Sequence, residues 1–189
     1  MTLSDTHFTD NELFHLAIAA ARQQQHEDTL RHLKTLLARN PEHAEAHYLL
    51  GTAYATLGMM EEAAQSLTLA LAQAPQLALA RFQLGLVRLG LGQPEQASQT
   101  LQPLTTQAAE PVLQAFALGV LAIQAGDGAA AEQHLRHGIH LNTANPALNQ
   151  DMQGLLEALE KMQLTDGKRP SEEEGLQVEN AYLLGAYRQ

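Results

Sequence analysis

The chain has 189 residues and a mass of 20.5 kDa, the size of one ordinary domain or one short array of repeats. Apolar residues make up 45% and aromatic residues only 4%, with no tryptophan, so a core must consist mainly of leucine and alanine, which favours helices over strands. The absence of cysteine excludes disulfides, thiol nucleophiles and cysteine zinc sites, and the net charge of −10 disfavours a nucleic-acid partner because it repels phosphate.

Residues 1–9 are interpreted as a short extension before the first helix. The segment 1–11 carries no lysine or arginine, whereas a secretory signal needs a basic start followed by an apolar run. No stretch of the chain approaches the roughly 18 consecutive apolar residues of a membrane span. These features predict a cytoplasmic protein that does not insert into a membrane.

A period of 34 residues runs through most of the chain. Two columns of glycine show it best, namely Gly51, Gly85 and Gly119, and Gly58, Gly92 and Gly126. Leucine and alanine recur at the same spacing at Leu50, Leu84 and Leu118, at Ala63, Ala97 and Ala131, and at Leu67, Leu101 and Leu135. The period predicts four repeats, spanning residues 10–43, 44–77, 78–111 and 112–145.

Each repeat is interpreted as a helix, a tight turn and a second helix. In the second repeat, residues 44–57 and 60–73 place apolar side chains at helical spacing, and Gly58 interrupts them. The glycine column of Gly58 suits the left-handed residue that ends a helix. The column of Gly51 lies inside the first helix, where glycine costs about 1 kcal/mol relative to alanine. We therefore expect the second helix to approach closely there, with Ala63 as the small partner.

This pattern resembles the tetratricopeptide repeat. The second repeat carries the family motif most fully, in Leu50, Gly51, Tyr54, Gly58, Ala63, Leu67, Ala70 and Pro75. The other repeats depart from it at Arg88 and Ala122 (for tyrosine), Gly138 (for alanine), Ala17 (for glycine) and Thr29 (for alanine). The resemblance covers about residues 10–145. It implies an all-α fold, a right-handed α-solenoid of about four helix pairs, and a role in binding other proteins.

Pro103 lies inside the predicted second helix of the third repeat. Proline removes a backbone hydrogen bond there and clashes with the carbonyl of Gln99, at a cost of about 3 kcal/mol or more. We expect the helix to kink or end near Gln102. The alternative is that this helix is short in any case, which Thr105 and Thr106 support.

Three further segments follow the repeats. Residues 146–162 are amphipathic and predict a helix that caps the array, with a polar outer face supplied by Gln150, Asp151, Glu157 and Lys161. Residues 163–175 have the composition of a linker. Residues 176–189 are apolar again and form a tail segment.

In a tetratricopeptide array the first helices of the repeats line a concave surface, and the resemblance identifies the positions that face it. The first such column contains half of the chain's aromatic residues. The predicted peptide-binding groove consists of Phe14, Ile18, Tyr48, Thr52, Phe82, Leu86, Leu89, Phe116, Val120 and Ile123. The alternative is that the aromatic column packs between neighbouring helices as core. A charged clamp for a C-terminal carboxylate is not expected, because its family positions hold Phe14, Ile18, Leu49, Leu79 and Gln83.

The tail is a candidate ligand for the protein's own groove or for that of a second copy, which would give a homodimer. Its apolar residues are Leu176, Val178, Tyr182, Leu183, Leu184 and Tyr187. Deleting residues 164–189 is then expected to raise the affinity for hydrophobic peptides. A tail without order, or one that docks on the capping helix, is the alternative.

No catalytic, cofactor or metal site is predicted. The chain has nine histidines, but His134, His137 and His140 diverge around one helix and belong to the outer side of the array. Gly90 and Gly92 are not followed by the lysine and serine or threonine of a phosphate loop. The chain is therefore interpreted as a non-enzyme.

The predicted function is that of an adaptor or scaffold that holds an apolar helical or extended segment of a partner protein in the groove. Two alternatives stay open. One is a small chaperone resembling the tetratricopeptide chaperones of bacterial secretion systems. The other is a structural subunit that assembles through its tail.

Overall fold

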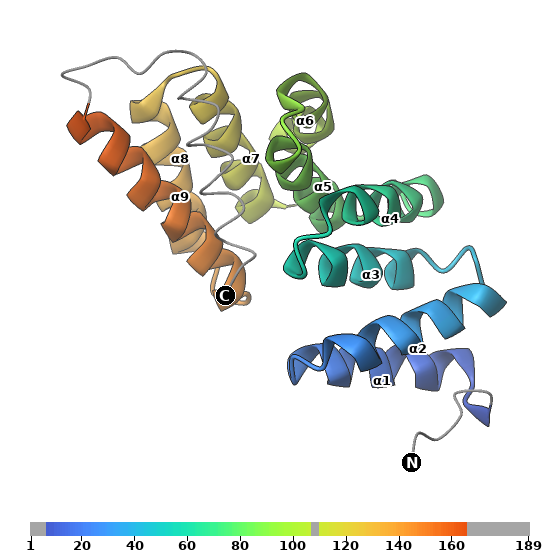
Figure 1. Ribbon diagram of the computed structural model, residues 1–189. Helices are drawn as coiled ribbons and strands as arrows, with labels where there is room; N and C mark the ends of the chain where they lie inside the picture. Colours follow the sequence, from blue (N-terminus) through green and yellow to red (C-terminus); the bar gives the residue numbers. More distant parts are fainter. Residues whose placement is uncertain (1–6, 107–109, 166–189) are drawn as a thin grey trace. The chain divides into compact units, whose positions relative to one another are not determined.

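The computed structural model describes residues 7–106 and 110–165, and the regular elements in those ranges are all helical (Figure 1). In chain order they are α1 Asp10–Arg22, α2 His26–Arg39, α3 Ala44–Thr56, α4 Met60–Gln73, α5 Ala78–Gly90, α6 Pro94–Leu101, η2 Gln102–Thr106, α7 Pro111–Gln124, α8 Gly128–Leu141 and α9 Pro146–Thr165. The element η2 is a short 3-10 helix. The prediction of an all-α fold built from helix pairs is confirmed.

The described residues divide into two compact units, with the boundary between Ala80 and Arg81. The N-terminal unit holds α1 to α4 and the start of α5, and α1 packs against α2 while α3 packs against α4. Its core includes a buried cluster formed by Leu13, Ala17, Leu33, Leu36, Ala46 and Leu50. The C-terminal unit holds the rest of α5 and the helices up to α9, and α8 packs against both α7 and α9.

Helix starts are stabilised by side chains that satisfy free backbone N–H groups. At α1, Thr9 Oγ1 accepts from the Glu12 N–H at 3.3 Å, and the Thr9 N–H donates to Glu12 Oε2 at 2.7 Å. The Thr9 hydroxyl also donates to Glu12 Oε2, at 2.8 Å. The hydrogen bonds that the Thr9 N–H and hydroxyl donate to the Glu12 carboxyl lower its pKa. At α8, Asp127 Oδ1 accepts from the Ala130 N–H at 2.9 Å. The helix α6 begins instead with Pro94, whose missing N–H needs no partner at the first helical position.

The turns between paired helices use a left-handed residue, as the glycine column predicts. Gly58, Gly92 and Gly126 have φ angles of 75°, 69° and 73°. The first repeat has Gln24 in the equivalent place, and Gln24 also adopts a positive φ, of 57°. A residue with a Cβ is disfavoured in this conformation, so the first turn carries backbone strain that the later turns avoid.

The second glycine column marks a close approach of paired helices, but the partner is a leucine. A Cβ atom at Gly51 would lie 2.6 Å from Cγ of Leu67, and one at Gly85 would lie 2.5 Å from Cγ of Leu101. The same relation joins Gly119 to Leu135, at 2.8 Å. The predicted close approach is therefore confirmed. The leucine of the second helix takes the space, and at Gly51 the carbonyl oxygen of Ala63, the predicted partner, would also lie 3.2 Å from the Cβ atom.

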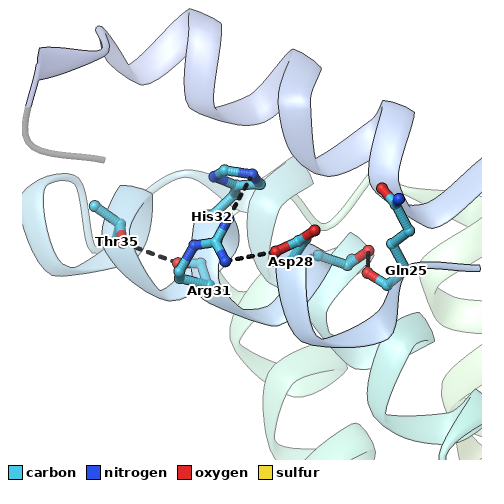
Figure 2. Close-up of polar contacts among 6 residues, drawn as sticks. Gln25, Asp28, Arg31, His32 and Thr35 are labelled. Carbon is cyan, nitrogen blue, oxygen red and sulfur yellow. Dashed lines mark hydrogen bonds and ion pairs between the residues drawn. The ribbon is translucent and has the colours of Figure 1, made fainter. Parts of the chain in front are cut away.

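Polar contacts along α2 explain how the first repeat accepts a residue that departs from the repeat pattern (Figure 2). Thr29 is buried where the pattern has alanine, and its hydroxyl donates to the Gln25 carbonyl at 2.9 Å. Nearby, Arg31 Nη1 pairs with Asp28 Oδ1 at 2.5 Å and Arg31 Nη2 lies 3.3 Å from Nε2 of His32. A buried hydroxyl with a hydrogen-bond partner costs little, so Thr29 does not disrupt the helix.

Pro103 ends the second helix of the third repeat, as predicted. The helix α6 stops at Leu101, and η2 continues the chain from Gln102 to Thr106. Leu104 of η2 is fully buried, and Gln114 of α7 donates through Nε2 to the Thr105 carbonyl at 2.6 Å. The shortened helix thus stays part of the core through the 3-10 segment.

Polar contacts join α9 to α8. Arg136 of α8 donates through Nη2 to Glu160 Oε1 of α9 at 2.9 Å. At the turn before α9, buried Asn142 donates through Nδ2 to Asn149 Oδ1 at 2.9 Å. Gln150, Glu157 and Lys161 are exposed, as expected of a capping helix.

Asp151 does not belong to that polar face. It is half-buried, because neighbouring positions on the same side of α9, such as Leu148, Leu155 and Ala158, are buried in the unit. Burial raises the pKa of the Asp151 carboxyl to about 6. The folded protein therefore binds a proton at Asp151 more tightly than the unfolded chain does.

This raised pKa predicts a stability that falls as the pH rises from about 4 to about 6 and stays low above that range. Replacing Asp151 by asparagine is expected to stabilise the protein at pH 7 by about 1 kcal/mol, after allowance for partial solvent exposure. The gain should shrink as the pH approaches 4. Thermal unfolding across this pH range measures it. Glu157→Gln on the exposed side of the same helix is the control, and an equal gain for both variants would contradict the prediction.

Candidate functional site

Four predicted groove residues in the N-terminal unit are half-buried. Phe14 and Ile18 lie one turn apart on α1, and Tyr48 and Thr52 lie one turn apart on α3. Side chains four residues apart share one face of a helix, and α1 contacts α3. We call these four residues the α1–α3 surface. All of them are neither fully buried nor fully exposed.

Phe14 is held in place from two sides. Its ring packs against the buried cluster of Leu13, Ala17, Leu33, Leu36, Ala46 and Leu50. It also contacts His43, with ring centroids 5.0 Å apart and planes tilted by 37°, and His15, with ring centroids 6.4 Å apart in a T-shaped arrangement. The His43 ring is itself fixed, because its Nδ1 accepts from the Ala46 N–H at the start of α3, at 3.2 Å. An ordered aromatic ring with partial exposure is suited to contact with a partner, since little side-chain entropy remains to be lost.

Tyr48 combines a packed ring with a polar end. Burial raises the pKa of its phenol, and a side-chain hydrogen bond with Thr52 opposes this effect. The hydroxyl of Thr52 also donates to the Tyr48 carbonyl at 3.0 Å. The phenol therefore stays neutral at physiological pH. It adds one polar group to the apolar area of the α1–α3 surface.

In the C-terminal unit the predicted groove column is core, and the expectation that it is exposed is wrong there. Phe82 and Phe116 have no exposed area, and their ring centroids are 6.1 Å apart. At Phe116 the space comes from Gly138 of α8, because a Cβ atom there would lie 2.4 Å from Cδ1 of the ring. The missing side chain leaves room for the ring between the helices. Leu86, Leu89 and Val120 are buried as well, and only Ile123 is half-buried.

Two cations take positions that the sequence reasoning did not assign. Lys34 Nζ of α2 lies 5.6 Å from the ring centroid of Tyr54 on α3, a cation–π contact between successive helix pairs. Arg88, which stands where the repeat pattern has tyrosine, donates through Nη1 to Thr100 Oγ1 and to the Gln96 carbonyl. Burial lowers the pKa of Arg88. The loss of tyrosine at that position was the only sequence signal for this contact between α5 and α6.

The remaining predicted site lies outside the described residues. It is the tail, with Leu176, Val178, Tyr182, Leu183, Leu184 and Tyr187. Within 7–106 and 110–165, no three histidine, aspartate or glutamate side chains gather so that they could hold a metal ion. Over the same part of the chain, no helix combines the length and the apolar character needed to cross a membrane.

Comparison with protein-family models matches residues 14–78 and 82–146 to the tetratricopeptide repeat. No curated protein matches the chain. Among solved structures, the crystal structure of MamA protein is similar over 94% of this chain and 91% of its own, with a TM-score of 0.59 and 16% identity. The structure from a study of Pseudomonas aeruginosa pilF covers 94% of this chain and 88% of its own, with a TM-score of 0.62 and 18% identity. At such identities the similarity shows a common fold.

Proposed function

The chain belongs to the tetratricopeptide repeat family, and we propose that it acts as a protein-interaction scaffold whose α1–α3 surface binds an apolar segment of a partner protein. The observation that carries the proposal is the partial exposure of Phe14, Ile18 and Tyr48 on two adjacent first helices. Aromatic and branched side chains that are held rigidly but not fully buried are typical of binding hot spots. The role proposed is binding without a reaction.

The charges around this surface indicate which partners it favours. Asp10 and Glu12 lie in the first turn of α1, and Glu45 lies in the first turn of α3. At the other end of α1, its last turn carries Arg22. Hydrogen bonds from Thr9 lower the pKa of Glu12, so this carboxylate is ionised at neutral pH. An apolar segment flanked by lysine or arginine would match this acidic margin, and complementary charge speeds association and selects partners.

The segment can be a helix or an extended strand. A helical partner would present its apolar residues at intervals of three and four, while an extended one would present every second residue. Both match a surface whose side chains lie one helical turn apart on two neighbouring helices. The proposal therefore names the chemistry of the partner and leaves both conformations to the experiment.

The test uses the full chain and a synthetic amphipathic peptide of leucine and lysine. We expect binding, with NMR chemical-shift changes centred on Phe14, Ile18, Tyr48 and Thr52. Replacing Tyr48 by alanine is expected to weaken binding by about tenfold or more, the loss typical of a hot-spot residue. Ile18→Lys should weaken it further, because it places a cation beside the lysines of the peptide. Isothermal titration calorimetry measures both effects.

Leu69→Ala is the matched control. Leu69 is an exposed apolar residue of the same unit, on α4, and its loss should leave binding unchanged. Circular dichroism must show that each variant is folded. Equal affinity of Tyr48→Ala and the unaltered protein would overturn the proposed site. A peptide of leucine and glutamate that binds as tightly as the lysine peptide would overturn the proposed charge preference.

A further inference from the structure

Two groups compete for one nitrogen of His43, a backbone N–H and a carboxylate. The Nδ1 atom accepts from the Ala46 N–H at 3.2 Å and lies 3.3 Å from Oε2 of Glu45. A backbone N–H only donates, so the first contact requires an Nδ1 without a proton, and the neutral ring carries its proton on Nε2. An ionised carboxylate only accepts, so the second contact becomes a hydrogen bond when Nδ1 carries a proton. The protonation of the ring therefore decides which of the two bonds forms.

The position of His43 makes this choice matter for α3, because His43 is the residue that caps the start of the helix. The helices α1 and α8 are capped by Thr9 and Asp127, which are residue types preferred at this position. Histidine differs from them because it is the residue type whose charge ordinarily changes between pH 5 and pH 8. A positive ring is repelled by the partial positive charge of a helix start and attracted by the Glu45 carboxylate. The His43 side chain is 22% exposed, so protons from solvent reach it.

The other ionisable groups around the start of α3 do not replace Glu45 as the partner of His43. In the part of the chain that the structure describes, Glu45 is the residue that forms an ion pair with His43. The remaining groups lie on α1, at the end of α2 and beside His43 in the chain, and they are Asp10, His15, Arg39, Glu42 and His47. Three of them, His15, Arg39 and His47, have a backbone carbonyl within hydrogen-bond distance.

The exchange of partners takes place at the edge of the α1–α3 surface. The His43 ring contacts Phe14, with centroids 5.0 Å apart, so a proton on His43 places a positive charge beside an aromatic member of this surface. The same proton engages Glu45, which belongs to the acidic margin in the first turn of α3. Both effects act against a partner that carries lysine or arginine, because like charges repel and one acidic residue of the margin is occupied.

We propose that protonation of His43 moves its Nδ1 from the Ala46 N–H to Glu45 and thereby weakens the binding of basic apolar segments to the α1–α3 surface as the pH falls. A proton from solvent binds to Nδ1, while Nε2 keeps the proton that it carries in the neutral ring. The inference rests on the function proposed for this surface and adds its regulation by pH.

The first test titrates the peptide of leucine and lysine into the full chain at pH 8 and at pH 5.5. We expect the affinity to be about three- to fivefold lower at pH 5.5, the size of one charge pair at a partly exposed site. The readout is the ratio of the two affinities, so a change in binding at pH 8 does not enter it. His43→Asn should bring this ratio to about one, because asparagine caps helices well and does not titrate.

His15→Asn is the matched control. His15 also contacts Phe14, but it is exposed, and its Nδ1 lies 2.7 Å from the Asn11 carbonyl within α1. Its replacement should preserve most of the difference between the two pH values. Equal loss of the difference in both variants would show that any charge beside Phe14 suffices, and would overturn the exchange at the cap as its cause.

A measurement without peptide separates this inference from the function on which it rests. At pH 8 the ¹⁵N signals of the His43 ring should place the proton on Nε2, and the Ala46 amide signal should shift on acidification with the same midpoint as the ring. A proton on Nδ1 at pH 8, or an Ala46 amide that does not follow the ring, would overturn the exchange. A pH-independent affinity would overturn the regulation. Absence of peptide binding at both pH values would overturn the proposed function, and the NMR titration would then decide on the exchange alone.

Discussion

Replacing Phe116 by alanine is expected to lower the free energy of unfolding by about 3–5 kcal/mol. Phe116 has no exposed area, packs against Phe82 and fills the space beside Gly138. Its removal leaves a cavity that the neighbouring helices cannot close without moving, since protein interiors are close-packed. Urea denaturation followed by circular dichroism measures the change.

The matched variant is Ile123→Ala on the same helix. Ile123 belongs to the same predicted groove but is half-buried, so its truncation should cost only about 1 kcal/mol. If the two variants lost equal stability, Phe116 would not be a core residue. The comparison separates the aromatic column that supports the fold from the positions that remain accessible to a partner.

Replacing Gly85 by alanine is expected to destabilise the protein by about 1–3 kcal/mol, although alanine is the better helix former. The new Cβ would lie 2.5 Å from Cγ of Leu101, and Leu101 is fully buried. The overlap must therefore be relieved by a shift of the paired helices. Chemical denaturation gives the size of the effect.

The effect of Gly85→Ala on stability should change sign when Leu101 is removed. This outcome shows that the overlap with Leu101 causes the loss, and not a general intolerance of substitution at Gly85. Leu101→Ala alone should cost about 2–5 kcal/mol, but in that background Gly85→Ala is expected to stabilise, because the leucine that blocks it is gone. A Cβ atom added at Gly154 on α9 would meet no atom within 4 Å, so Gly154→Ala should stabilise by about 0.5–1 kcal/mol in either background. A loss from Gly85→Ala in the absence of Leu101 would contradict the proposed cause.

Spacing in the sequence was sufficient to predict the helix pairs and the roles of both glycine columns. The column of Gly58 could be assigned because a positive φ is a local property of one residue. The column of Gly51 could be assigned to a close approach because glycine inside a helix costs stability, which a close neighbouring helix explains. Its partner could not, because spacing does not show whether Ala63 or the longer side chain of Leu67 fills the gap.

Burial of the aromatic column could not be predicted because it depends on contacts between helices. Phe14 and Phe116 occupy the same position in their repeats, yet one is half-buried and the other has no exposed area. Gly138 leaves room for the Phe116 ring, and its departure from alanine is visible in the sequence, but its distance from Phe116 is not. Phe82 is buried as well, although Leu104 stands one period before Gly138. Asp151 was assigned to the exposed face of α9 for a related reason. The sequence of a helix with mixed polar and apolar residues does not show which positions beside its apolar side are buried.

The positive φ of Gln24 affects which part of the chain unfolds first. Its backbone conformation costs about 1 kcal/mol more than it would with glycine. In an array of nearest-neighbour contacts, the repeat with the weakest hairpin unfolds first. Fraying should therefore begin at the α1–α2 turn, which makes this turn the expected point of first proteolytic cleavage within the repeats.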